Sequence, residues 1–202
     1  MQLVVISSPE AVAQEVQLMS EMLAAGLPRL HLRKPNFSGL EMRNFVAQLP
    51  AKYHPRLVLH GHPDLVTGMK LGGLHLTTTA RKALTSRPKL AAGQTLSTSF
   101  HTLAEIRRHR RKYDYVFLSP VFDSLSKSGY AAGFELSTVA EALWQLQRRT
   151  GYTPQVLALG GVEAHRLAAV RQAGFAGAAV LGAVWQSPDP VAAFHKLQAV
   201  AG

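Results

Sequence analysis

The sequence predicts an α/β fold, a small single-domain (β/α)8 TIM barrel that takes in residues 1–202. Eight short runs rich in β-branched residues or leucine recur along the chain, each followed by a polar turn and a helical pattern. The runs are continuously apolar, which is typical of parallel strands covered on both faces. Units of about 25 residues each close most economically into a barrel. The predicted strands are residues 3–6, 29–33, 56–60, 73–76, 94–98, 115–118, 155–159 and 177–181.

An open, doubly wound sheet is the alternative arrangement of the same units. It would usually place a glycine-rich dinucleotide-binding turn directly after its first strand. The first strand runs here into VVISSPEAVAQ, which contains no glycine. The barrel is therefore the favoured interpretation.

The segment between the first two strands has recognisable helix signals. Ser8 is a candidate N-cap, Pro9 suits the first helical position, and Gly26 with Pro28 would end the helix. The next helix is expected to begin at Ser38 and to end before Pro50. The helix after the third strand is expected to be short.

Composition limits the function classes. The 22 Lys and Arg residues exceed the 12 Asp and Glu residues, and the net charge of +10 suits an anionic partner. A small phosphorylated substrate is favoured over nucleic acid, because the chain has no zinc-ligand spacing and no aromatic-rich strand pair. The basic run at 105–114 falls near the end of a predicted helix, where the helix dipole favours cations.

The cellular compartment and the possible redox chemistry are inferred from sequence features that are missing. The chain has no cysteine, so disulfides and thiolate chemistry are excluded. No stretch is apolar enough to span a membrane, and MQLVVISSPE lacks the features of a signal peptide. We expect a cytoplasmic protein with no membrane partner.

Functional residues of such barrels lie at the carboxyl ends of the strands. The second strand ends in HLRKP, which supplies His31, Arg33 and Lys34, and the fifth leads into Ser99 and His101. Arg33 would be costly to bury without an anion, so we expect an anionic ligand or a carboxylate beside it. Further histidines end the third and fourth strands, at 60, 62 and 75, and a histidine inside the short fourth strand is more often a satisfied core residue.

The last two strands carry a candidate phosphate site. Gly160 and Gly161 follow the seventh strand, and Gly182 with Ala183 follows the eighth. Paired glycines let backbone amides approach a phosphate closely, and phosphate sites recur at these two positions of such barrels.

The sixth strand leads into VFDSLSKSG. Ser124, Ser126 and Lys127 are placed to close over an anionic substrate, with the hydroxyls donating hydrogen bonds and the ammonium pairing with phosphate. A polar surface loop is the alternative interpretation.

Five segments occur in the order of a known family: LHLRKP, GGLHL, STSFHTLAEI, YDYVFLSPVFDSLSKSG and VLALGGVEAHRLAAVRQAGFAGAAVLGAV. The chain resembles the thiamine phosphate synthase family, which includes the TenI-type thiazole tautomerases. The resemblance covers nearly the whole chain. It implies a (β/α)8 barrel that forms a homodimer and binds a thiazole phosphate.

The resemblance also implies a Mg²⁺ site, whose ligands are missing from this sequence. Synthases of this family bind a pyrimidine diphosphate through Mg²⁺, held by an Asn-Asp pair after the third strand and by a second aspartate after the fourth. His60 and Gly61 stand here in place of the pair, and Ala80 stands near the second aspartate. Mg²⁺ prefers hard oxygen ligands. We therefore expect no metal and no other cofactor, with Mg²⁺ required only if the protein is a synthase.

Other family positions are matched more closely. His31 and Arg33 fall on the first two positions of a QxRxK element, whose lysine is displaced here to Lys34. Ser99 matches a serine near the reacting centre, and Gly161 matches the phosphate-binding glycine. The remaining matches are Ser124, Ser126 and Lys127 on a Thr-x-Thr-Lys loop and Gly182 at a position where serine is usual.

The pattern resembles the tautomerase branch, whose reaction moves a double bond in a carboxylated thiazole phosphate and requires an acid and a base but no metal. The histidine that those enzymes use after the sixth strand corresponds here to Pro120. His101, or else His31, would then have to transfer the proton. Two alternatives stay open: a divergent thiamine phosphate synthase with His60 or Asp64 in a rearranged metal site, and a non-catalytic protein that binds a thiamine precursor.

Overall fold

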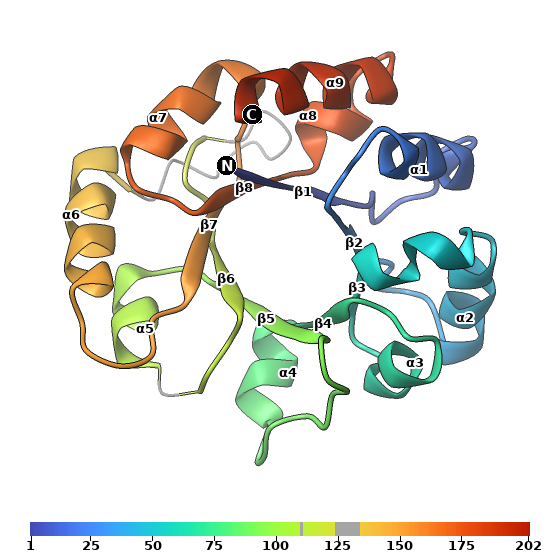
Figure 1. Cartoon of the computed structure of the whole chain (residues 1–202), viewed down its shortest axis with the longest axis horizontal. Helices are drawn as coiled ribbons and strands as arrows, with labels where there is room; N and C mark the ends of the chain where they lie inside the picture. The colour runs from blue at the N-terminus through green and yellow to red at the C-terminus, as the bar shows by residue number, and fades with distance from the viewer. Residues whose placement is uncertain (110, 124–133) are drawn as a thin grey trace.

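The computed structural model describes residues 1–109, 111–123 and 134–202 and forms a closed barrel of parallel strands with helices outside it (Figure 1). Each strand pairs with its sequence neighbours, and β1 pairs with β8 to close the ring. All eight predicted strands are present within two residues of their expected ends, so the predicted fold is confirmed. The strands are β1 Gln2–Ile6, β2 Arg29–Leu32, β3 Leu57–His60, β4 Gly73–Leu76, β5 Thr95–Phe100, β6 Tyr115–Leu118, β7 Gln155–Leu159 and β8 Gly177–Val180.

The helices follow the strands and cover the outer face of the barrel (Figure 1). Several are only one or two turns long, which is how a chain of 202 residues completes eight units. In the described residues the α-helices are α1 Glu15–Ala24, α2 Gly39–Ala47, α3 Pro63–Gly68, α4 Thr78–Ala83, α5 Leu103–Arg108, α6 Leu136–Gln147, α7 Leu167–Gln172, α8 Gly182–Trp185 and α9 Pro190–Ala201; two 3-10 helices cover Ala51–Arg56 and Ala164–Arg166.

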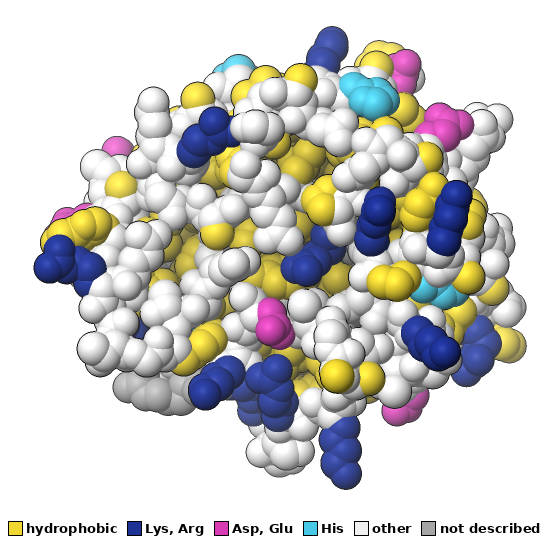
Figure 2. Space-filling view, viewed as in Figure 1, with side chains coloured by type: hydrophobic (Ala, Val, Ile, Leu, Met, Phe, Trp, Pro, Cys, Tyr) yellow, Lys and Arg dark blue, Asp and Glu magenta, His cyan; other side chains and the backbone are white. Residues whose placement is uncertain are grey.

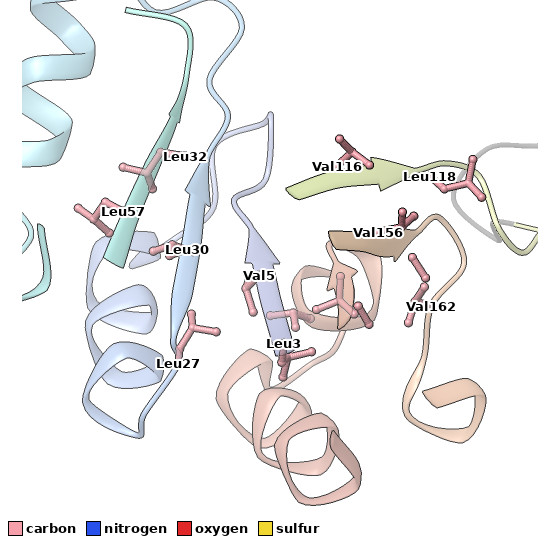
Figure 3. Packing of buried hydrophobic residues seen from close by; sticks show 14 of the residues in the cluster. Leu3, Val5, Leu27, Leu30, Leu32, Leu57, Val116, Leu118, Val156 and Val162 are labelled. Carbon is pink, nitrogen blue, oxygen red and sulfur yellow. The ribbon is translucent and has the colours of Figure 1, made fainter. Parts of the chain in front are cut away.

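Alternate residues of each strand build two separate apolar layers. Leu3 and Val5 of β1 and Leu30 and Leu32 of β2 point outward and pack against the helices (Figure 3). The residues between them point into the barrel, where Val4, Ile6, Tyr115, Phe117, Leu157 and Ala179 form a second cluster. Both faces of the strands are thus buried, which explains the continuous apolar runs.

Helix α2 begins as predicted, whereas α1 does not. Ser38 caps α2 in a capping box, accepting from the Glu41 amide while the Glu41 carboxylate accepts from the Ser38 amide. Helix α1 was expected to begin at Ser8–Pro9 and instead begins at Glu15. The Ser8 hydroxyl accepts from the Glu10 amide in a local turn, and Gln14 takes a left-handed conformation that a continuous helix excludes.

The positive charge is spread over the surface. On the face drawn in Figure 2, Lys and Arg side chains are scattered, one near the centre and the others farther out, and do not gather in one patch. Part of the basic run has a structural role, because the Arg111 guanidinium donates to the carbonyls of Arg81 and Leu84. None of the helices in the described segments is long and apolar enough to cross a membrane.

Candidate active site

A polar cluster occupies the inside of the barrel on the side of β2 to β6. His31, His60 and His75 enter it from β2, β3 and β4, and the register pairs His60 with His75. The rings of His60 and His75 stack with their centroids 4.2 Å apart, and the His31 ring meets both edge-on. We call these three residues the histidine cluster. His31 and His75 are buried, whereas His60 is partly exposed.

Hydrogen bonds fix each ring of the histidine cluster. The Nδ1 atom of His31 lies 3.0 Å from Nε2 of His60, and its Nε2 lies 2.6 Å from the Tyr115 hydroxyl. His75 is held on both sides, with Nδ1 2.9 Å from the Ser97 hydroxyl and Nε2 3.1 Å from the Ser99 hydroxyl. Hydroxyls both donate and accept, so neutral rings are satisfied here.

Burial keeps the histidine cluster neutral. Burial lowers the pKa of His60 to about 3, with a further contribution from the Arg33 charge. Burial is also the main reason that the pKa values of His31 and His75 lie well below the usual range, and the neighbouring histidines add to the effect. At neutral pH the cluster therefore offers imidazole nitrogens with lone pairs and no added positive charge.

His101 is exposed and directly follows the end of β5, at the mouth of the barrel. Its Nδ1 atom lies 2.9 Å from the Ser119 carbonyl oxygen. A carbonyl oxygen only accepts, so Nδ1 carries the proton and Nε2 carries the lone pair of the neutral ring. His101 is thereby presented as a base with a defined basic atom.

Arg33 is exposed just beyond the end of β2, so the expectation of a buried guanidinium is wrong. Its backbone amide donates to the Ser7 hydroxyl at 2.8 Å, which anchors the chain here. Its positive charge is one cause of the lowered pKa of His60 and His75. The exposed side chain can meet an anion at the mouth.

Lys34 is oriented differently from the expected substrate-binding lysine. Its ammonium lies 2.6 Å from the Glu15 carboxylate in a buried ion pair and 3.0 Å from the Glu10 carbonyl oxygen. The pair lines a cavity of about 630 Å³ between α1 and α2, outside the strands. The ammonium is engaged with α1, and the structure does not present it to a ligand at the mouth.

The glycines predicted to bind phosphate lie on the loops after neighbouring strands β7 and β8. Gly160 and Gly161 both have positive φ, and a Cβ at either position would overlap the segment 119–123 that follows β6. The two loops therefore pack tightly against each other, and the glycines are required by that packing. Gly182 and Ala183 open α8, which is tied to β1 by the Trp185 indole donating to the Ile6 carbonyl at 2.7 Å.

Replacing Gly161 by Ala is expected to lower the free energy of unfolding by about 1–3 kcal/mol, because the new methyl group would overlap the Asp123 carbonyl oxygen and the Phe122 side chain. Urea unfolding measures the change. Gly93→Ala is the matched control, since Gly93 also has positive φ but has no atom within 4 Å of the added Cβ. Equal losses in the two variants would show that backbone strain, and not the loop contact, requires glycine at 161.

Ser124, Ser126 and Lys127 lie outside the described residues. Of the other predicted site residues, the structure brings His31 and Ser99 to the histidine cluster: His31 belongs to it, and the Ser99 hydroxyl bonds His75, whose ring contacts that of His31. The sequence interpretation missed the cluster itself, together with Tyr115. A signal was available, because histidines occur at inward-facing positions of three successive strands.

A family model described as thiamine monophosphate synthase matches residues 3–184. The chain belongs to the thiamine monophosphate synthase family. It is 28% identical over 195 residues to the thiamine-phosphate synthase of Cronobacter sakazakii, covering 95% of this chain and 90% of that protein. It is 26% identical over 179 residues to the thiamine-phosphate synthase of Desulfitobacterium hafniense (strain Y51), covering 87% and 84%. The structure of a thiamine phosphate pyrophosphorylase from Bacteroides thetaiotaomicron matches with a TM-score of 0.82 at 29% identity, over 100% of this chain and 98% of that one.

The histidine cluster does not fit Mg²⁺. Within the described part of the chain, it is the one group of three or more His, Asp or Glu side chains close enough together to hold a metal ion. It contains no carboxylate, and Asp64 lies apart from it in the first turn of α3. Mg²⁺ dehydrates reluctantly and prefers oxygen ligands, so three imidazoles are a poor site for it.

Proposed function

We propose that this protein acts on a thiazole phosphate in thiamine biosynthesis and moves a proton on it without Mg²⁺, as a TenI-like tautomerase. The observation that carries the proposal is the histidine cluster inside the barrel, where His60 stands at the position of the family's Asn-Asp pair and where imidazoles and hydroxyls are the donors. Membership of the family supports the thiamine-precursor class of substrate.

The predicted site residues that the structure describes have the following roles in this proposal. His101 removes and returns the proton through Nε2, since its Nδ1 proton is committed to the Ser119 carbonyl. Arg33 pairs with the carboxylate of the substrate, and the Ser99 hydroxyl, which bonds Nε2 of His75, supplies a further polar group beside the histidine cluster. The loops at 160–161 and 182–183 hold the phosphate through backbone amides.

A divergent thiamine phosphate synthase is the second candidate. The names of the related proteins favour it, because those relatives are called thiamine-phosphate synthases. That reaction would join a pyrimidine diphosphate to the thiazole phosphate with release of pyrophosphate and would depend on Mg²⁺. A protein that binds the thiazole phosphate without turnover is the third candidate.

Calorimetric titration, together with assays of substrate conversion and of pyrophosphate release, separates the three candidates. We expect thiazole phosphate to bind, and we expect a pyrimidine diphosphate analogue to bind no more tightly with Mg²⁺ than without it, while the carboxylated thiazole phosphate is converted to its isomer. Mg²⁺-dependent diphosphate binding with pyrophosphate release would overturn the proposal in favour of a synthase. Binding without conversion under either assay would identify a non-catalytic protein.

A homodimer in the cytoplasm completes the proposal. The dimer comes from the family resemblance, and the cytoplasmic location is the expectation drawn from the composition of the sequence. Light scattering of the purified chain measures the oligomeric state directly, and a monomer would contradict this part of the proposal alone.

A further inference from the structure

We propose that the histidine cluster binds one transition-metal ion of the Zn²⁺ or Co²⁺ class inside the barrel. One ring nitrogen from each of His31, His60 and His75 can be chosen so that all three lie within 4.8 Å of one another. Three histidines around one ion are a common ligand set for zinc, with the fourth position left to water or a ligand. This inference stands apart from the proposed function, because it assigns no step of the reaction to the ion.

The rings have to move closer together and turn to hold an ion. Nitrogens bound to tetrahedral Zn²⁺ at 2.0–2.1 Å lie about 3.3 Å apart. The Nδ1 atom of His31 and Nε2 of His60 are 3.0 Å apart, close to that separation, and both rings have to turn so that their lone pairs converge on an ion beside the line that joins the two atoms. One nitrogen of His75 lies within 4.8 Å of the two others, so the ring of His75, which stacks on that of His60, has to move closer to complete the ligand set.

Residues around the histidine cluster would orient the ligands. The Tyr115 hydroxyl bonds Nε2 of His31 at 2.6 Å, and the Ser97 hydroxyl bonds Nδ1 of His75 at 2.9 Å. Each contact occupies one nitrogen and leaves the other for an ion, as partners of metal-bound histidines generally do. Binding through Nε2 of His75 would replace its contact with Ser99, at the cost of one hydrogen bond.

Charge and donor type decide which ion fits. The 3.0 Å contact between Nδ1 of His31 and Nε2 of His60 holds one proton, which has to move to another ring nitrogen or leave before both atoms can bind an ion. Arg29, over the Tyr115 ring, and Arg33, at the mouth, oppose any cation, so the coordinate bonds must be strong. Imidazole suits zinc, copper, nickel and iron, and offers little to Mg²⁺ or Ca²⁺.

The test uses the full-length chain, stripped with a chelator and then titrated with Zn²⁺ alone by calorimetry. We expect one ion per chain, and with Co²⁺ we expect the visible absorption of a tetrahedral complex. His60→Asn and His75→Asn should abolish stoichiometric binding, whereas His62→Asn, a histidine two positions from the cluster and outside it, should bind like the wild type. Tyr115→Phe should weaken Zn²⁺ binding by about 10–100-fold.

Three outcomes would overturn the metal site: no stoichiometric Zn²⁺ binding, binding that His60→Asn leaves unchanged, or Co²⁺ absorption typical of a water-bound octahedral ion. Circular dichroism of each variant checks that it is folded, and His60 is the least buried ligand and the safest to replace. Titration of the stripped protein with thiazole phosphate tests the proposed function separately. A failure to bind Zn²⁺ would therefore contradict only the metal site, and a failure to bind thiazole phosphate would contradict only the proposed function.

Discussion

Replacing His101 by Asn is expected to lower the rate of thiazole tautomerisation by about 10²–10⁴-fold while leaving the affinity for thiazole phosphate within a few-fold of the wild type. The Asn amide nitrogen can still donate to the Ser119 carbonyl, as Nδ1 does now, so the loop keeps its anchor. What the variant lacks is the basic Nε2 atom. The measurement is single-turnover conversion of the carboxylated substrate together with calorimetric affinity.

His195→Asn is the matched control, because it removes an exposed histidine from α9, on the outer layer of the barrel, and should not change the rate. Two results would contradict the role given to His101. An unchanged rate would move proton transfer to another group, with His31 or His60 as the next candidates. Equal losses of rate and affinity would make His101 a residue that binds the substrate in both states.

The barrel could be predicted because its strands carry their own signal. Runs such as QVLAL and GLHL are buried on both faces, and the structure has them as β7 and β4 with the expected ends. Helix starts were less secure where local polar contacts compete with the helix. Ser8 looks like an N-cap in sequence, but its hydroxyl accepts from Glu10 in a turn, and Gln14 delays the helix to Glu15.

The site could be predicted only in part, because its geometry depends on contacts between strands. The sequence places His31 and Ser99 near the carboxyl ends, but the register that pairs His60 with His75 is set by the closed sheet. Tyr115 is an ordinary strand aromatic in sequence and becomes a hydrogen-bond partner only when β6 faces β2 across the barrel. The direction of Lys34 likewise depends on where Glu15 lies after the folding of α1.

Replacing Lys34 by Met is expected to lower the free energy of unfolding by about 3–5 kcal/mol near neutral pH, because it leaves the Glu15 carboxylate buried without its counter-charge. Methionine keeps an apolar stem beside Phe45, so the loss reports on charge more than on packing. Urea unfolding measures it. Lys196→Met, an exposed lysine on α9, should change stability by about 0.5 kcal/mol or less.

The pH dependence identifies the buried carboxylate as the cause. Burial raises the pKa of Glu15, and Lys34 is the group that lowers it, so the Lys34→Met variant should raise this pKa further. A carboxyl whose folded pKa exceeds its unfolded value binds its proton more tightly when folded, so its favourable contribution is present below the unfolded pKa and is lost as pH rises through the folded one. The deficit of Lys34→Met relative to wild type should therefore be smaller at about pH 4 than near neutrality. The double variant Lys34→Met/Glu15→Leu should recover most of the lost free energy of unfolding at both pH values, because no charge remains buried. A loss of stability that persists in the double variant and does not depend on pH would show that Lys34 acts through packing.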